Sequence, residues 1–163
     1  MATTSRPRSN GRRAFTLIEL VVVMAILAIV AAMVIPYASD GASYEAMAAA
    51  RRLVADLEYA QSMSITEQSP VTVTFVESEE RYTLTNASGT LKHPIDKEDY
   101  VVDFDDGQDF GQVDLYSASF GTQKAVTFDE LGAPSQAGTI LLQAGPHLYT
   151  IKVAAATGAI TIE

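Results

Sequence analysis

The stretch that decides the fold is Arg12-Arg13-Ala14-Phe15-Thr16-Leu17-Ile18-Glu19-Leu20, which opens an apolar run that continues to Ile35. Between Phe15 and Ile35, only Thr16 and Glu19 are polar. A helix rises about 1.5 Å per residue, so this run would extend over about 31 Å, close to the roughly 30 Å hydrocarbon core of a bilayer. The run therefore predicts one membrane-crossing helix over residues 15–36.

Glu19 is the residue that does not suit a membrane helix. A charged side chain costs about 2.5–3.5 kcal/mol at mid-bilayer and less near the edge, and such groups are usually paired. The cations within reach are Arg12 and Arg13, by snorkelling, and the α-amino group that a cut before Phe15 would create. The alternative is a glutamate at the membrane edge that is protonated or faces water.

Residues 13–20 resemble the type III signal of type IV pilins and type II secretion pseudopilins. The resemblance implies that a prepilin peptidase cuts between Ala14 and Phe15 and methylates the new amino group of Phe15. It also implies that Glu19 is needed for subunits to join a filament, and that Pro36 is a helix-kinking proline. Ala14 departs from the pattern, because the family usually has glycine before the cut.

Charge is distributed unevenly along the 163 residues, which carry 11 basic and 20 acidic side chains. Four of the basic residues and none of the acidic ones precede Phe15, which leaves a net charge of −13 from there on. The positive-inside rule then keeps the leader, residues 1–14, in the cytoplasm while the acidic body crosses. Such a body argues against nucleic-acid binding, which needs clustered Lys and Arg.

The resemblance completes this picture with a location and partners. It implies a single-pass protein of the bacterial inner membrane whose C-terminal domain lies in the periplasm and joins a periplasmic filament. The implied partners are the prepilin peptidase, other pseudopilins or pilins, the inner-membrane assembly platform and the lipid bilayer. No cofactor is implied.

An ordinary secretory signal peptide is the alternative interpretation of the N-terminal region, with cleavage within residues 36–39. The apolar run is longer than the usual 7–15 residues, and Glu19 interrupts its start, so both features count against this alternative. The chain contains no cysteine, which excludes a disulfide framework, thiol chemistry and a lipoprotein attachment site.

Residues 37–68 are predicted to form an amphipathic helix after a weak point at Pro36 and Gly41. Arg52 and Asp56 are expected to lie off its core-facing stripe. The stripe itself consists of apolar and small residues at three- and four-residue steps: Ala46, Met47, Ala50, Leu53, Val54, Leu57, Ala60 and Ser64.

From Val71 the period changes to two, and alternating runs separated by turn residues predict seven to nine antiparallel strands over residues 69–163. The predicted fold class is α+β: a long N-terminal helix, with a membrane half and an amphipathic half, packed on an antiparallel β-sandwich-like domain. Residues 51–53, 58–60, 70–75, 128–134 and 156–162 resemble the H-type minor pseudopilins (general secretion pathway protein H), which implies this same architecture.

Two groups of side chains are candidates for a chemical site. His93 and His147 lie beside prolines in turns and are interpreted as surface residues. The acidic cluster is interpreted as a solvated loop or, less favourably, a calcium site, because it offers hard oxygen ligands but fails the EF-hand spacing. Its members are Asp103, Asp105, Asp106 and Asp109. No nucleophile, metal-hydrolase or nucleotide-binding motif is present, so no enzyme is predicted.

Three functions therefore compete. The first is a minor pseudopilin of a type II secretion pseudopilus. The second is a minor pilin of a type IV pilus or DNA-uptake system, although the lysines of the body are too scattered in sequence to indicate a basic strip. The third is a membrane-tethered β domain that binds a ligand or acts as an enzyme.

Overall fold

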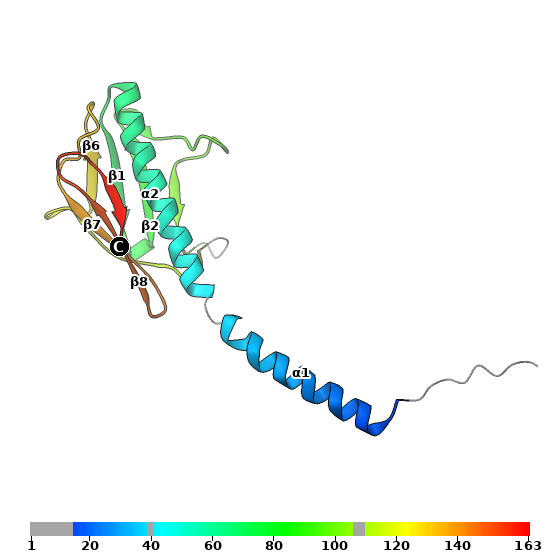
Figure 1. Ribbon diagram of the computed structural model, residues 1–163. Coiled ribbons are helices and arrows are strands. Elements are labelled where there is room, and N and C mark those ends of the chain that lie inside the picture. Colours follow the sequence, from blue (N-terminus) through cyan, green and yellow to red (C-terminus); the bar gives the residue numbers. More distant parts are fainter. Residues whose placement is uncertain (1–14, 39–40, 106–109) are drawn as a thin grey trace, which may run out of the picture. The chain divides into compact units, whose positions relative to one another are not determined.

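The computed structural model describes residues 15–38, 41–105 and 110–163, with the side chains of residues 33–38 left undescribed. The chain divides into two compact units, Met1–Ser39 and Asp40–Glu163. The first unit holds the helix α1, and the second holds the helix α2 and the strands β1 to β9 (Figure 1).

Helix α1 (Leu17–Ala38) has Glu19 as its one charged residue in sequence. It includes Pro36 and ends two residues later. The kink at Pro36 and the end of the membrane helix at residue 36 stay predictions. Among the residues described, no helix combines the length and the apolarity that a membrane crossing requires. The membrane-crossing role of residues 15–36 likewise stays a prediction.

Helix α2 (Gly41–Glu67) opens the second unit and buries one face. Met47 and Val54 are only partly buried. The expectation that Asp56 lies off the core is wrong, since its exposed fraction is 4%. Asp56 falls three residues after Leu53 and four before Ala60, which puts it on the core-facing side of the helix. The buried residues are Ala46, Ala49, Ala50, Leu53, Asp56, Leu57, Ala60 and Ser64.

The first sheet has β1 at its centre. Its strands are β1 (Val71–Val76), β2 (Arg81–Asn86), β3 (Gly89–Thr90), β4 (Val101–Asp103) and β6 (Ala125–Phe128). The order is β3-β2-β1-β6, and β4 also pairs with β2. All pairs are antiparallel, and the side chains of β1 alternate between buried and more exposed, as their period of two predicts.

The second sheet carries the C-terminal half of the domain. Its strands are β5 (Asp114–Ser119), β7 (Gly138–Ala144), β8 (His147–Val153) and β9 (Ile160–Ile162), in the order β5-β7-β8-β9. These pairs are also antiparallel. The register of β5 shifts between Leu115 and Ser117, which marks a bulge on this edge strand.

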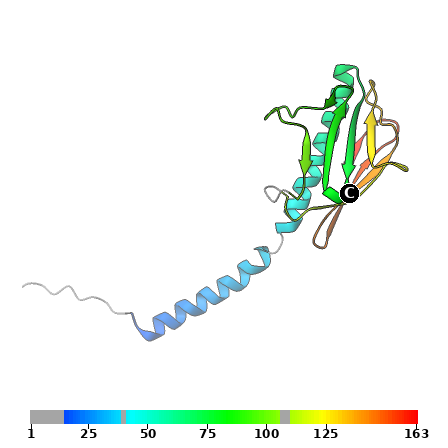
Figure 2. The same ribbon diagram turned by 180° about the vertical axis from the view of Figure 1, so that it is seen from behind.

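Helix α2 joins the two sheets into one core, because it contacts β1 and β6 of the first sheet and β7, β8 and β9 of the second. Figures 1 and 2 show α2 on one side of β1 and β2, seen from opposite directions. Phe75 of β1 stacks on Phe120, just after β5, with ring centroids 5.9 Å apart. The predicted α+β class, a helix packed on antiparallel sheets, is confirmed.

Candidate functional site

The start of α1 is defined by a cap that Thr16 supplies. The backbone N–H of Glu19 donates to Oγ1 of Thr16 at 3.3 Å, and the N–H of Leu20 donates to the carbonyl of Thr16 at 3.2 Å. Thr16 is thus the N-cap and Glu19 the third helical residue, which is the Thr-x-x-Glu spacing of a capping box. The negative charge of Glu19 also lies where a helix dipole favours it. This spacing is a sequence signal for the start of the helix.

The side chains of α1 form an apolar surface without cover in the described part of the chain. Every side chain from residue 15 to residue 32 is exposed. Phe15 and Leu17 are 80% and 81% exposed, respectively. A contiguous apolar surface of this length marks an interaction with a membrane or with other proteins.

The predicted cleavage and pairing residues are described only in part. Phe15 and Glu19 lie at the exposed start of the α1 segment, whereas Ala14, Arg12 and Arg13 lie outside the described residues. Within the described ranges, Glu19 forms no ion pair.

The acidic cluster that suggested calcium is described for two of its four members. The backbone N–H of Asp105 donates to Oδ1 of Asp103 at 2.9 Å, a local turn. Asp106 and Asp109 lie outside the described residues. In the described segments, no three His, Cys, Asp or Glu side chains are grouped to hold a metal ion. The calcium interpretation therefore stays an untested prediction.

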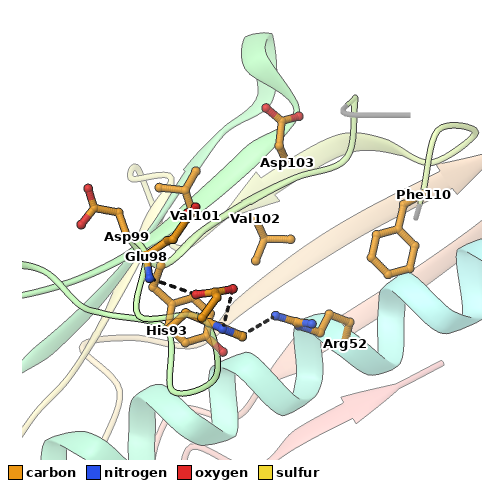
Figure 3. A pocket seen from close by; sticks show the side chains of 10 residues that line it. Arg52, His93, Glu98, Asp99, Val101, Val102, Asp103 and Phe110 are labelled. Carbon is orange, nitrogen blue, oxygen red and sulfur yellow. Dashed lines mark hydrogen bonds and ion pairs between the residues drawn. The ribbon is translucent and has the colours of Figure 1, made fainter. Parts of the chain in front are cut away.

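The second unit contains a pocket of about 270 Å³ between α2, residues 93–103 and Phe110 (Figure 3). Arg52 comes from α2, and the other side chains come from the loop before β4, from β4 itself and from the segment that follows. The lining residues are Arg52, His93, Asp96, Glu98, Asp99, Tyr100, Val101, Val102, Asp103 and Phe110.

Asp56 lies at the centre of a buried polar network beside this pocket. Both of its oxygens lie 3.0 Å from Nε of Arg52, one turn earlier on α2. The hydroxyl of Tyr82 donates to Oδ2 at 2.6 Å, and the hydroxyl of Tyr100 donates to Oδ1 at 3.0 Å. Three donors, one of them the Nε–H that both oxygens share, satisfy the carboxylate, which is the condition for burying such a charge.

The network also shifts the pKa values of Arg52, Tyr82 and Tyr100. Burial, reinforced by the negative charge of Asp56, raises the pKa of both Tyr82 and Tyr100. Burial alone would lower the pKa of Arg52, but its hydrogen bond and ion pair with Asp56 leave that pKa raised. The two tyrosines are therefore neutral hydrogen-bond donors, and Arg52 stays a cation. These hydrogen bonds hold α2, β2 and the loop before β4 together. We call this set of residues the clamp: Arg52, Asp56, Tyr82 and Tyr100.

His93 extends the network to the pocket. Its Nε2 lies 3.2 Å from a terminal nitrogen of Arg52, and its ring meets Tyr100 edge-on with centroids 4.8 Å apart. A guanidinium only donates, so Nε2 accepts and the proton lies on Nδ1, 3.1 Å from Oδ2 of Asp96. Those two atoms are close, but they are not aligned as a hydrogen bond.

The surface interpretation of His93 is wrong, because its side chain is only 16% exposed. Its packing partners, Arg52 and Tyr100, belong to other elements, so the local Pro-flanked turn did not reveal them. His147 begins β8 and is partly exposed.

Comparison with known proteins places these features in a family. Residues 49–157 match the model of the type II transport protein GspH, and residues 9–35 match that of the prokaryotic N-terminal methylation motif. No curated protein matches the chain in sequence.

Solved structures share the fold. The minor pseudopilin EpsH of the Vibrio cholerae type 2 secretion system has a TM-score of 0.57 at 15% identity, over 73% of this chain and 96% of that one. A second EpsH structure gives 0.56 at 13% identity, over 72% and 92%. The type IV minor pilin FimU of Pseudomonas aeruginosa gives 0.53 at 17% identity, over 74% and 90%. On the match over residues 49–157, this chain belongs to the type II transport protein GspH family.

Proposed function

We propose that this GspH family member is a minor pseudopilin that supports protein export as a subunit of a type II secretion pseudopilus. The observation that carries the proposal is the apolar, exposed start of α1, which lies inside an N-terminal methylation motif. The exposed apolar surface of such a helix is expected to be buried against a membrane or another protein. In a filament, the helices of neighbouring subunits bury one another's apolar surfaces. We assign the chain no catalytic role, since the clamp around Asp56 offers satisfied groups rather than reactive ones.

The proposed maturation begins at the inner membrane. The basic leader, residues 1–14, stays in the cytoplasm, and the acidic body lies in the periplasm. Prepilin peptidase removes the leader after Ala14 and methylates the amino group of Phe15. The inner-membrane assembly platform and other pseudopilins are the further partners in this scheme.

Assembly then pairs two charges that would otherwise be costly in lipid. Glu19 of one subunit meets the ammonium group of Phe15 on its neighbour. Leaving either charge unpaired in a low dielectric costs several kcal/mol, so pairing fixes the axial offset between subunits. The capping position of Glu19 keeps its carboxylate at the first turn of α1, close to the level at which a neighbour's Phe15 would lie.

A minor pilin of a type IV pilus is the second candidate function. The likeness to FimU favours it, and the helix would work in the same way in both filaments. A strain in which the gene for this chain is deleted distinguishes the two functions. We expect this strain to lose secretion of extracellular type II substrates but to keep normal pili. Restoring the gene should restore export. Lost piliation with intact export would overturn the pseudopilus assignment.

The leader junction allows a direct prediction. Ala14→Gly restores the residue that the family usually has before the cut, so we expect processing at least as fast as in the natural chain. Pulse–chase labelling, with leader loss followed on a gel, measures this rate, and Ala14→Leu is the control that should slow the cut. Slower processing of Ala14→Gly would show that the cleavage site is misplaced.

A further inference from the structure

Four polar side chains form a row across the outer face of the second sheet. Ser119 of β5 is paired with Thr139 of β7, which is paired with Lys152 of β8, which is paired with Thr161 of β9. Residues directly opposite one another on neighbouring strands lie on the same face of a sheet. Ile151, the residue before Lys152, is fully buried, so the row faces away from the core. We call these four residues the polar row.

The polar row lies in a second pocket of the domain, with a volume of about 510 Å³. Neighbouring strands are about 4.8 Å apart, so the row extends over about 14 Å. It supplies all the polar side chains among the described residues that line this second pocket. The other lining residues are glycine, alanine or valine: Gly121, Ala137, Gly138, Val153, Ala154 and Ala159. A volume in this range is typical of sites for small ligands.

The turns at both ends of the second pocket are held by hydrogen bonds. After β5, the N–H of Phe120 donates to the carbonyl of Gln123 at 2.9 Å, and the N–H of Gln123 donates back at 3.0 Å. The ring of Phe120 fills the place of a side chain at Gly138, where a Cβ would collide with it. Between β8 and β9, the N–H of Ala154 donates to the carbonyl of Ala159 at 3.0 Å. The second pocket is therefore formed in advance, which lowers the cost of binding.

The second pocket is positively charged in an otherwise acidic body. Lys152 is the one charged residue among the described residues that line it. Its Nζ lies 2.6 Å from Oε2 of Glu163, but the two side chains are 49% and 59% exposed. Exposed ion pairs contribute little, so the ammonium group can turn toward a ligand at small cost. The second pocket therefore favours an anionic group at Lys152, with hydrogen-bonding groups along the rest of the row.

We propose that the polar row binds an acidic saccharide, whose carboxylate meets Lys152 and whose hydroxyls meet Ser119, Thr139 and Thr161. Hydroxyl side chains both donate and accept, which matches the hydroxyls of a sugar. One ammonium group balances one negative charge, which favours a carboxylate over a doubly charged phosphate ester. An extended peptide would instead pair with a free sheet edge, whereas β7 and β8 lie inside the sheet. This site goes beyond the proposed function, which requires no ligand.

Titration of the ¹⁵N-labelled full-length protein in detergent micelles tests the proposal by NMR. The probes are the trimer of galacturonic acid and the disaccharide of N-acetylglucosamine and N-acetylmuramic acid, two sources of a sugar carboxylate. We expect saturable shifts at the amides of the polar row, and binding at least about fivefold weaker for the methyl esters, which lack the charge. Binding of the trimer indicates an acidic polysaccharide as the source, and binding of the disaccharide indicates the cell wall. No saturable shift with either probe, or equal binding of the methyl esters, would overturn the proposal.

Variants of the row assign the contacts. Lys152→Gln is expected to weaken binding at least about fivefold and Thr139→Val about threefold, whereas Glu163→Gln should strengthen it about twofold by freeing the ammonium. The matched control is Lys92→Gln, because Lys92 is also exposed and paired with an acid, Asp99, but lies outside the second pocket. Its affinity should equal that of the natural chain, and circular dichroism checks that each variant is folded. Equal losses in Lys152→Gln and Lys92→Gln, or unchanged binding in both row variants, would refute the site.

Discussion

Glu19→Gln is expected to be processed like the natural chain but to lose its place in the filament. Glutamine fits the third position of a capping box as well as glutamate does, so the start of α1 is preserved while the charge is removed. The amide cannot neutralise the ammonium of a neighbouring Phe15, and a cation left unpaired in lipid is costly. We expect its amount in the isolated periplasmic filament to fall by at least about tenfold, a loss that corresponds to about 1.4 kcal/mol.

The matched control for this experiment is Thr16→Val. It removes the Oγ1 that accepts from the N–H of Glu19 but keeps the carboxylate. Loss of an N-cap costs about 1 kcal/mol of helix stability and leaves the charge pair in place, so incorporation should change little. Normal assembly of Glu19→Gln, or an equal defect in Thr16→Val, would contradict the pairing model.

The second large effect is expected at Asp56. Asp56→Ala removes the acceptor of the Tyr82 and Tyr100 hydroxyls and the partner of Arg52. Breaking a buried ion pair by removing one member costs about 3–5 kcal/mol, and Arg52 is partly exposed, so we expect about 3 kcal/mol in the free energy of unfolding. For a domain of this size, that lowers Tm by about 10 °C.

Thermal unfolding of the full chain in detergent, followed by circular dichroism, measures this shift. Glu58→Ala is the control, since it removes an exposed acid from the same helix and should stay within about 0.5 kcal/mol of the natural chain. Asp56→Asn should fall between the two, because its amide oxygen still accepts a hydrogen bond. A Tm for Asp56→Ala equal to that of Glu58→Ala would show that the network does not hold the domain together.

The sheets could be predicted because their information is local. In β1, Val71, Val73 and Phe75 alternate with threonines, and the buried side chains follow that period. Turn residues separate the later strands, and the nine strands among the described residues fall within the predicted seven to nine. The start of α1 is also encoded locally, by the spacing of Thr16 and Glu19, which is that of a capping box.

The clamp was missed because its partners come from distant parts of the sequence. Asp56 reads as a charged residue on an amphipathic helix, and only Tyr82 and Tyr100, 26 and 44 positions later, make its burial favourable. The Arg52–Asp56 spacing was a usable signal, because it places a cation one turn from an acid on the core-facing side. Side-chain periodicity predicts which face is buried, but not which polar groups meet there.

The central claim is that the leader is removed and that Phe15 begins the mature subunit. Mass spectrometry of the N-terminal peptide, from chain recovered with the filament, tests it most directly. The account predicts a peptide that starts at Phe15 and carries one methyl group on its amino nitrogen. A peptide that still begins at Met1, or one that starts near Ser39, would contradict it.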